Sequence, residues 1–435
     1  MLNDFKEAFN VAYAILINGG WVAFAAMLLY MFYRLYMDYI KIRWYSQQDF
    51  VLLRIVSPGD NEKSPLAFEQ IFGHLHSVQG GMTWPEIHIE GQFQPWITWE
   101  IVSIGGNISN YVQVISKFRD TVEAAIYSQY PNAEITEAED YLAKLPNYYP
   151  DTSEYDLWGL EFRYMRPNFY PIRTYLDFEH STAETFVDPV TGIWEEMAKM
   201  NPYEMLIVQF FLRPIDDDDW KKPGYELVQK LKGVPEANKR PEDWLPKVLG
   251  VVFGPILDAF IRPGETKPAA RQQDEPPSLM LHLTEGEKTI INAIERKLSK
   301  LAYQTKIVFL YIAPKEKFNV RPVWGAIVGS FKSVNAHNLN ALKPDTKKWT
   351  KINYKIFKNL EKPILELFTN LRKIKFMKRV RKRWYFIGAP PNIMNAEELA
   401  TLIHFPQIDV TVPNVEKVQV VKEQPPPELP IAGEL

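Results

Sequence analysis

The chain has 435 residues, of which 46% are hydrophobic and 14% aromatic, so wholesale disorder is excluded and two or three folded domains are expected. It contains no cysteine, which excludes disulfides, thiolate nucleophiles and sulfur-based zinc sites and fits a reducing cytoplasmic location. The net charge is −3, but residues 343–383 hold 15 Lys and Arg against 3 Asp and Glu, so this segment is +12 and the remainder is −15.

The first predicted element is a transmembrane helix over Val11 to Tyr33. These 23 residues carry no charge, and a helix of about 20 apolar residues crosses a bilayer. Trp21 and Leu28 lie within the run, and Arg34 opens a basic stretch that predicts a cytoplasmic location for everything that follows. A cleaved signal peptide and a buried core helix are the alternatives, but the run exceeds the apolar segment of about 7–15 residues of a signal peptide. We expect a single-pass protein of the cytoplasmic (inner) membrane.

The next block is predicted to fold as strand, helix, hairpin, helix, strand. Ser64 and Pro65 have the N-cap and N1 pattern of a helix start, and Gly105-Gly106-Asn107 is a hairpin signal. We expect strands at 47–56, 96–104, 108–115 and 133–136, and helices at 64–80 and 116–130. The order βαββαβ is that of a ferredoxin-like, or split βαβ, unit, so the fold class is α+β.

A second α/β block is predicted after residue 157, interrupted by a long insertion. Before the interruption we expect strands at 159–164, 172–178 and 204–212 and helices at 188–201 and 223–231. After it, Thr284 and Glu287 form a capping box that opens a helix to about residue 302. A strand at 306–312, a helix at 323–334, a strand at 384–387 and a helix at 396–403 follow.

The insertion is rich in proline and charge and contains one apolar island, Trp244 to Ile261. Lys247, Asp258 and two prolines argue against a second transmembrane span. The island fits equally well a segment lying on the membrane or a partner and a packed helix. The expected organisation is an anchor (1–45), a ferredoxin-like domain (46–150), a second α/β domain (151–232 and 281–342) split by an insertion (233–280), a basic helical segment (343–383), a strand and helix (384–418) and a proline-rich tail (419–435).

Sequence motifs of common enzymes are absent. No G-x-x-x-x-G-K-[ST] phosphate loop, G-x-S-x-G elbow or H-E-x-x-H helix occurs. His74, His76 and His88 are the one histidine cluster, but positions two apart on a helix point about 200° away from each other, so ordinary structural histidines are favoured over a metal site. No catalytic, cofactor-binding or metal-binding residue is predicted, and the protein is expected not to be an enzyme.

The basic segment is the candidate binding site. Its lysines recur mostly at spacings of three or four, which predicts one basic helical face, with Ile352, Ile356, Leu360 and Ile364 on another. Such a face can bind phosphates of nucleic acid or anionic lipid. Trp349, Trp384 and Tyr385 can stack on bases or belong to a core, and a solvated charged face without a ligand is the alternative. The candidate contacts are Lys347, Lys348, Lys351, Lys355, Lys358, Lys362, Arg379, Arg381, Lys382 and Arg383.

Several stretches together resemble a known family. They are YSQYPNAEITEAEDY at 127–141, FYPIRTYLDFE and DPVTGIWEEM within 169–197, LTEGEKTIINAIERKLSKLAYQTKIVFLYIAP at 283–314, NAEELATLIHFP at 395–406 and PPPELP at 425–430. Read with the N-terminal anchor, they resemble the membrane-anchored region that precedes a HerA/FtsK-type ATPase domain in bacterial type IV secretion and conjugative-transfer proteins.

The resemblance implies an oligomeric assembly and docking module of a DNA or protein translocation machine. In that family the proline-rich exit leads into a motor domain with a phosphate loop, which this sequence lacks, so the motor is expected on another chain. The competing interpretation is an independent nucleic-acid or anionic-lipid binding membrane protein that uses residues 347–383.

Overall fold

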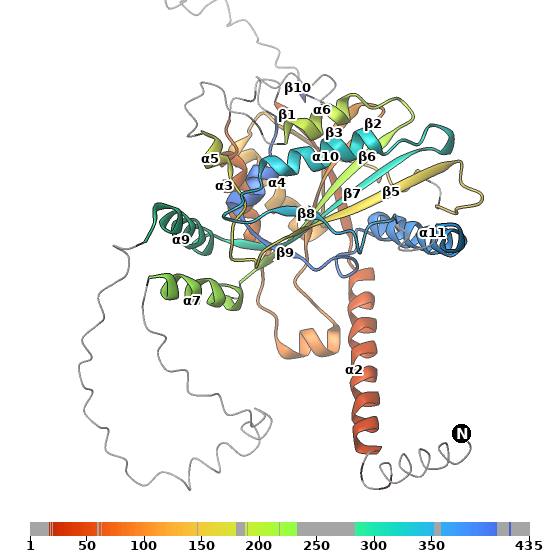
Figure 1. The fold of residues 1–435 in the computed structure, drawn as a ribbon, viewed down its shortest axis with the longest axis horizontal. Helices are drawn as coiled ribbons and strands as arrows, with labels where there is room; N and C mark the ends of the chain where they lie inside the picture. Colours follow the sequence, from red (N-terminus) through yellow and green to blue (C-terminus); the bar gives the residue numbers. More distant parts are fainter. Residues whose placement is uncertain are drawn as a thin grey trace, which may run out of the picture. The chain divides into compact units, whose positions relative to one another are not determined.

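Figure 1 shows the computed structural model of the chain. The described residues are 17, 19, 21–58, 61, 63–145, 147–179, 188, 190–216, 218–232, 283–351, 358–406 and 417–418. The whole predicted insertion (233–280) with its apolar island and the proline-rich tail (419–435) therefore lie outside the described residues, as do Val11 to Leu16 of the predicted anchor. The described chain divides into a larger unit and a smaller one made of Phe169–Pro171 and Asp217–Ser299.

The first half of the larger unit has the predicted βαββαβ order. The elements are β1 (Phe50–Pro58), α3 (Leu66–Leu75), β2 (Ile97–Ile104), β3 (Asn107–Ile115), α4 (Arg119–Gln129) and β4 (Glu134–Glu137). Their strands lie in the order β4-β1-β3-β2, with every neighbouring pair antiparallel. Gly105 and Gly106 close the β2–β3 hairpin at φ of 59° and 88°, values that glycine adopts without strain. The prediction for this block is confirmed.

The second half repeats this order. Its elements are β5 (Tyr155–Tyr164), α6 (Thr191–Ala198), β6 (Met205–Ile215), β7 (Ala302–Pro314), α10 (Arg321–Ser333) and β8 (Leu342–Pro344). The strands lie in the order β8-β5-β7-β6 and all pair antiparallel. The interruption predicted for this half falls between β6 and β7, at the place where the first half has its two-glycine turn.

One sheet runs through both halves because β2 pairs with β6. The two strands are antiparallel over eight residue pairs, from Ile97 opposite Leu212 to Ile104 opposite Met205. The complete order is β10-β1-β3-β2-β6-β7-β5-β8, with β4 on β1 and β9 (Asn392–Asn395) on β7. Apart from the parallel pair of β1 with β10 (Lys417–Val418), the sheet is antiparallel.

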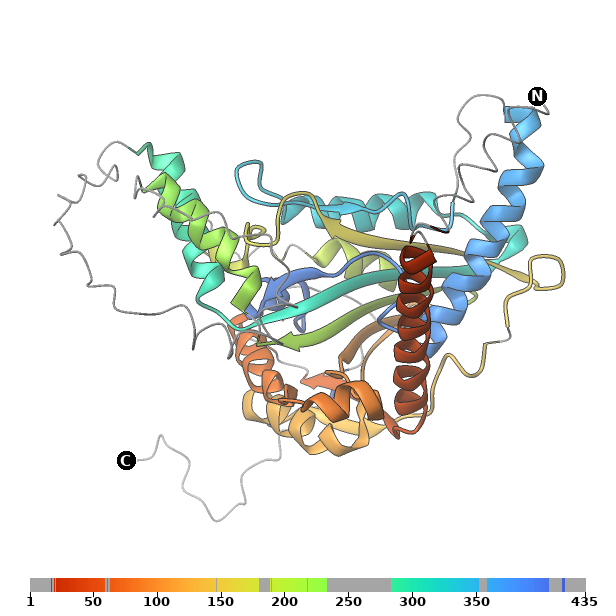
Figure 2. The ribbon, with the colours of Figure 1, turned by 90° about the horizontal axis from the view of Figure 1, so that it is seen from below.

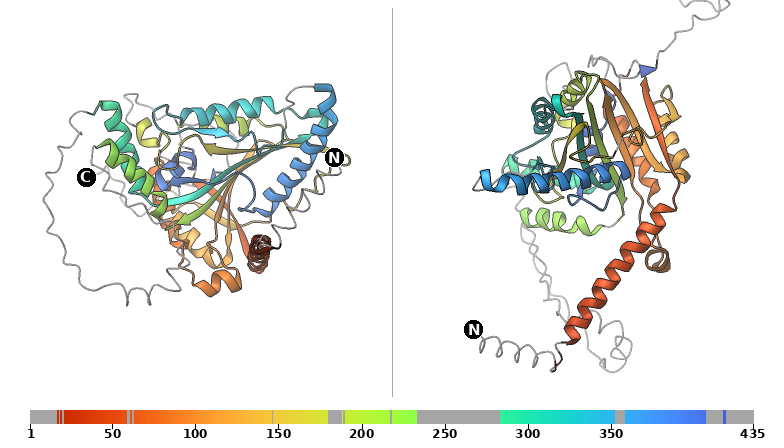
Figure 3. Two further views of the ribbon diagram at one scale, coloured as in Figure 1. Left: turned by 60° about the horizontal axis from the view of Figure 1, so that its bottom comes forward. Right: turned by 90° about the vertical axis from the view of Figure 1, so that its right-hand side faces the viewer.

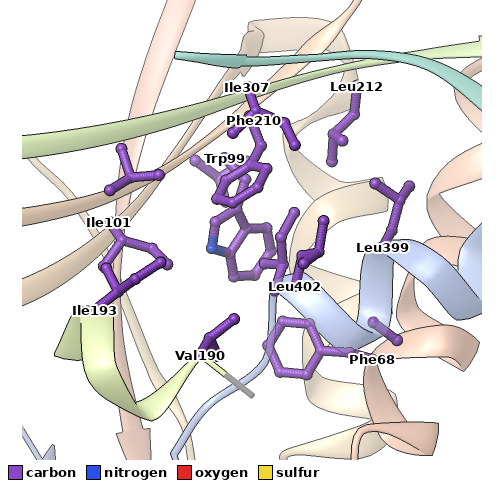
Figure 4. Packing of buried hydrophobic residues seen from close by; sticks show 14 of the residues in the cluster. Phe68, Trp99, Ile101, Val190, Ile193, Phe210, Leu212, Ile307, Leu399 and Leu402 are labelled. Atoms are coloured by element: carbon purple, nitrogen blue, oxygen red, sulfur yellow. The ribbon is translucent and has the colours of Figure 1, made fainter. Parts of the chain in front are cut away.

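Helices from both halves cover one face of the sheet. Alternate strand residues such as Trp99, Phe210 and Ile307 point to this face, as the period of two in a strand requires (Figure 4). They pack against α3, α4, α6, α10 and α12 (Ala396–Leu402). All seven residues of α12 are buried, so this short helix forms the middle of the core rather than a surface layer. Asn395 and Glu398 form a capping box at its start.

The described part of the smaller unit includes the helices α7 (Lys222–Leu231) and α9 (Glu285–Leu298). They share an apolar core of Val228, Ile291, Ile294 and Leu298. The predicted capping box of Thr284 and Glu287 is present. The two helices that were assigned to the second α/β domain therefore belong to the same compact unit as the insertion.

Two predicted strands are wrong. Residues 172–178 form an extended stretch and the short helix α5 (Tyr175–Glu179), whose start is held by the N–H of Tyr175 donating to Thr401 Oγ1 at 3.0 Å. Residues 384–387 form a turn, and Lys306 donates from Nζ to the Tyr385 carbonyl at 2.6 Å and the Ile387 carbonyl at 3.2 Å. In both places a side chain from a distant element satisfies backbone groups that a strand would have paired.

The helix α2 (Trp21–Ser46) has 26 residues and extends away from the sheet (Figure 1). Large apolar side chains are exposed along its N-terminal half, among them Trp21, Leu28 and Tyr33 at 58%, 50% and 45%; Arg34 follows them on the surface. Of the helices in the described part of the chain, none combines the length and apolar character needed to cross a bilayer.

The C-terminal end of α2 is packed firmly onto the larger unit. The Tyr45 ring stacks on Trp96 with centroids 5.2 Å apart and meets Trp384 edge-on at 4.7 Å. Gly91 has φ 77° and lies so close to α2 that a Cβ there would sit 2.4 Å from the Ile40 carbonyl carbon. The direction of α2 is therefore fixed by contacts with the folded unit.

Candidate functional site

The structure divides the predicted basic site into three parts. Lys347, Lys348 and Lys351 are exposed in a turn, because the helix begins only at Lys358. Lys355 and the side chains of Lys358 and Lys362 lie outside the described residues. The expected single helical face from Lys347 to Lys362 is thus wrong for its first three lysines, which belong to the turn at 346–351.

The helix itself is α11 (Lys358–Lys382), and two of its predicted phosphate contacts are structural instead. Arg379 is buried and pairs through Nη1 with the equally buried Glu161 of β5. Arg383, directly after the helix, is 1% exposed and holds Glu100 of β2 at 2.8 Å (Nε to Oε1) and 3.0 Å (Nη2 to Oε2). Neither guanidinium is accessible to a phosphate, so the prediction that Arg379 and Arg383 bind phosphate is wrong.

A buried hydrogen-bond network surrounds Glu100. Gln209 Nε2 donates to Oε1 at 2.6 Å and the Tyr141 hydroxyl donates to Oε2 at 2.8 Å. Arg383 also contacts Asp140 at 2.9 Å. Burial alone lowers the pKa of Arg383, but the facing Glu100 carboxylate more than reverses this and holds that pKa well above its usual range. The network keeps the C-terminal half of α11 against the sheet.

A third buried cation, Lys306 of β7, lies on the same face of the sheet. Burial, together with the nearby charge of Arg379, lowers its pKa to about 8. It fixes the turn after α11 through the two carbonyls described above. Arg381 is half-buried and donates to the Asn147 side chain at 2.6 Å, whereas Lys382 is exposed, so Lys382 alone of the four terminal cations remains fully available.

The N-terminal half of α11 carries an exposed apolar stripe. Figure 2 shows this half (light blue) projecting from the sheet, and the right-hand view of Figure 3 shows the same. The stripe consists of Ile364, Leu367, Phe368 and Leu371, which are 58%, 59%, 52% and 43% exposed. Their spacing of i, i+3, i+4 and i+7 places all four on one helix face. Of the predicted apolar face, only Ile364 is part of this stripe among the described side chains.

Beside the other face of α11 lies a pocket of about 450 Å³, which we call the tryptophan pocket. Trp158, Trp324 and Trp349 line it, with ring centroids 5.9 Å apart for the first pair and 5.7 Å for the second. Arg321, Lys351 and Lys373 contribute its basic side chains. Trp384 and Tyr385, the other two aromatics considered as base-stacking residues, instead pack with Trp96 and Phe386.

Sequence reasoning found Trp349 and Lys351 of this pocket and missed the rest. Trp158 and Arg321 are 163 positions apart, so no spacing pattern joins them. The local signal at α10 was the exposed Arg321 one turn before Trp324, a cation and a ring on one helix face. A cation and a ring at this spacing are common on helix surfaces, so the pair alone does not indicate a site.

The three candidate histidines lie in different surroundings. His74 is exposed, His76 is buried with Nε2 3.1 Å from the Ile215 carbonyl, and His88 stacks on Trp84 with centroids 4.6 Å apart. In the described ranges, no three His, Asp or Glu residues are placed to hold a metal ion.

Comparison with known proteins gives a family without a known activity. The chain belongs to the family described as Domain of unknown function (DUF8128), which matches residues 46–418. This range begins at the last residue of α2 and ends with β10, so it contains both halves of the sheet, the insertion and α11. No curated protein matches the chain.

Proposed function

We propose that this protein is a membrane-anchored docking module whose α+β region binds another protein chain. The observation that carries the proposal is the apolar stripe of α11. Four large side chains that are each at least 43% exposed form one face of a helix whose other end is locked into the core. Amphipathic helices with this spacing bury their apolar face in the groove of a partner.

The anchor supports the membrane part of the proposal. The uncharged run Val11 to Tyr33 is long enough to span a bilayer, although its first residues lie outside the described range. The described remainder of the run exposes large apolar side chains, which is costly in water and favourable in lipid. Arg34, Lys41 and Arg43 favour a cytoplasmic position for the folded region, because they give that side of the anchor the excess of positive charge.

The sequence resemblance supplies the class of partner. It points to a HerA/FtsK-type ATPase on another chain and to the assembly of a type IV secretion-like, conjugative machine. Charges of both signs flank the α11 stripe, namely Glu361, Lys362, Glu366 and Arg372, so the groove that receives it is expected to be apolar with a polar rim. In this scheme the protein binds and positions the motor and does not hydrolyse nucleotide itself.

A second candidate function rests on the basic turn. Lys347, Lys348 and Lys351 are exposed together, and no ion pair of theirs occurs in the described part of the chain. Such a cluster can bind nucleic acid or anionic lipid without any protein partner.

Photo-crosslinking in intact cells tests the docking proposal. A photoreactive residue at Phe368 is expected to capture a chain that carries a motor ATPase phosphate loop, identified by mass spectrometry. The same residue at Leu66 on α3, which is 48% exposed against 52% for Phe368, is the matched control and should capture nothing specific. Capture of a second copy of this chain at Phe368, or equal capture at both positions, would overturn the proposal.

A further inference from the structure

The tryptophan pocket is not used by the docking proposal, and it has a defined place in the fold. It lies beside the edge of β5 on which β8 pairs with Phe162 to Tyr164 and the turn at 346–351 bonds to Gly159. The start of α10 forms one wall and Thr369 and Lys373 of α11 form the other. These α11 residues lie on the opposite side of the helix from the apolar stripe, so the two surfaces are independent.

The pocket presents aromatic surface in a concave site. Trp158 and Trp324 meet at an interplanar angle of 74°, and Trp324 and Trp349 at 56°. Trp158 is 5% exposed, so the partly buried Trp324 and Trp349 supply most of the accessible ring surface at the pocket. A flat aromatic ligand can stack on such a face with little loss of entropy on the protein side.

The charged residues that line the pocket are all basic. Among its lining residues three are basic and none is acidic. Lys373 is neutralised by Asp156, 2.6 Å from its Nζ, which leaves Arg321 and Lys351 as positive charges. Lys347 and Lys348 extend this positive region along the turn. The site therefore attracts an anion to the rim of an aromatic hollow.

The turn that carries Trp349 is held rigidly. Thr350 donates its N–H to the Gly159 carbonyl at 3.0 Å and accepts the Gly159 N–H on Oγ1, also at 3.0 Å, which continues the edge of β5. Asp345 caps the turn by accepting the N–H of Lys347 on Oδ1 at 2.9 Å. A ligand would find the ring and the lysines already in position, which lowers the entropic cost of binding.

We propose that the tryptophan pocket binds an unpaired base of single-stranded nucleic acid, with the adjoining phosphates on Arg321, Lys351 and the lysines of the turn. An aliphatic side chain of a protein would use the aromatic walls and leave the cations without a partner. A lipid phosphate would use the cations and leave the rings exposed. A base joined to a phosphate uses both, and paired bases in a duplex cannot enter the pocket.

The test measures binding of fluorescein-labelled oligothymidylate to the full chain in nanodiscs of neutral lipid, by anisotropy across a salt series. Trp349→Leu should weaken binding roughly 5- to 150-fold, the effect of removing the stacking of one base. Lys347→Glu with Lys351→Glu should weaken binding as well and lower the salt slope by roughly 0.7 for each phosphate that is no longer neutralised. Lys347 and Lys351 are exposed, so their replacement should not disturb folding. The double lysine variant therefore still tests the proposal if Trp349→Leu does not fold.

The matched controls are Trp84→Leu, which removes a 65% exposed tryptophan outside the pocket, and Lys332→Glu, which reverses an exposed charge on α10. Neither should change binding more than about twofold, the range expected for surface substitutions away from a binding site. Equal affinity for duplex DNA of the same length would overturn the proposal, as would unchanged binding by both pocket variants. Preference of the turn for vesicles containing phosphatidylglycerol, with no oligonucleotide binding, would assign the cations to lipid instead.

Discussion

The two halves of α11 differ in charge and in environment, since residues 358–370 hold two lysines and two glutamates, whereas residues 371–382 hold seven Lys and Arg and no acid. Toward the C-terminus, Phe376 and Val380 are buried, and Arg379 reaches Glu161 beneath the helix. Phe376 fits over Gly159, where a Cβ would lie 2.3 Å from its ring. Toward the N-terminus, the helix exposes the apolar stripe. The basic half of the helix is therefore held in the fold by buried cations, and the other half offers an exposed apolar surface.

The largest expected effect comes from breaking the buried half. Arg379→Met leaves the Glu161 carboxylate buried with only the Ala389 N–H as a hydrogen-bond donor. We expect the free energy of unfolding to fall by about 3–5 kcal/mol, measured by denaturant titration of the full chain in detergent. Adding Glu161→Gln should recover part of this loss. An equal loss for Lys382→Met, an exposed cation at the end of the same helix, would contradict the assignment.

A pair of truncations tests where the proposed anchor ends and the folded unit begins. Deleting residues 1–36 removes the exposed part of α2 and keeps the buried Met37 and Ile40 and the Tyr45 contacts. Deleting residues 1–45 also removes Tyr45 and its ring contacts with Phe50, Trp96 and Trp384, which should lower the unfolding free energy by about 2–4 kcal/mol relative to the shorter deletion.

The same truncations test the membrane anchor. Both should be released from membranes by carbonate, and the full chain should remain bound. Release of the full chain would contradict the anchor, and equal stability of the two deletions would show that the aromatic contacts of Tyr45 contribute little.

The pair of His404 and Asp188 is another buried pair of charges, and its contribution to stability depends on pH. The two buried side chains lie 3.1 Å apart, and although burial lowers the pKa of His404, the Asp188 charge raises it above the ordinary value. A raised pKa means that the pair stabilises the fold fully below about pH 6.5 and that this stabilisation is lost as the pH rises through the folded-state pKa.

We expect His404→Gln to cost about 1.5–3 kcal/mol near pH 6 and progressively less at alkaline pH. Urea titrations of both chains across this range measure the difference. A cost independent of pH would show that the histidine acts by packing alone.

The smallest expected effect on stability is in the exposed half. Leu367→Gln with Phe368→Ser should change the unfolding free energy by less than about 0.5 kcal/mol per site, since neither side chain is part of the core. Chemical denaturation measures this, and crosslinking at Leu371 in the same variant should disappear. A large destabilisation would mean that the stripe is covered within the chain itself.

Local signals were enough to predict the first half of the sheet. The two glycines at 105–106 and the N-cap pattern at Ser64–Pro65 act within a few residues, and the strands between them appear where expected. The join of β2 to β6 has no local signal, because strand pairing depends on which edges remain open after each half has formed. The turn after α11 was mistaken for a strand because its aromatic residues favour strands, while Arg383 at φ 48° and Gly388 at φ 106° reverse the chain there.

The candidate site shows the same limit. Charge spacing found the exposed lysines of the turn and equally selected Arg379 and Arg383, whose carboxylate partners are 218 and 283 positions away in the chain. Sequence alone gives the number of charges and not their partners. The apolar stripe of α11 was only partly visible, since Leu367, Phe368 and Leu371 resemble ordinary helix core until the structure places them on the outside.

In the shared sheet, each half of this protein covers the strand edge that the other half would otherwise expose. A lone βαββαβ half would leave β2 or β6 as an open edge, whose unpaired N–H and C=O groups recruit strands from other chains. Pairing the two edges reproduces within one polypeptide what two identical copies achieve by symmetric assembly. Because β2 and β6 belong to one chain, their pairing does not depend on protein concentration. The two halves can also differ in sequence and in length. Only the second carries the insertion between its inner strands, an asymmetry that two identical subunits do not have.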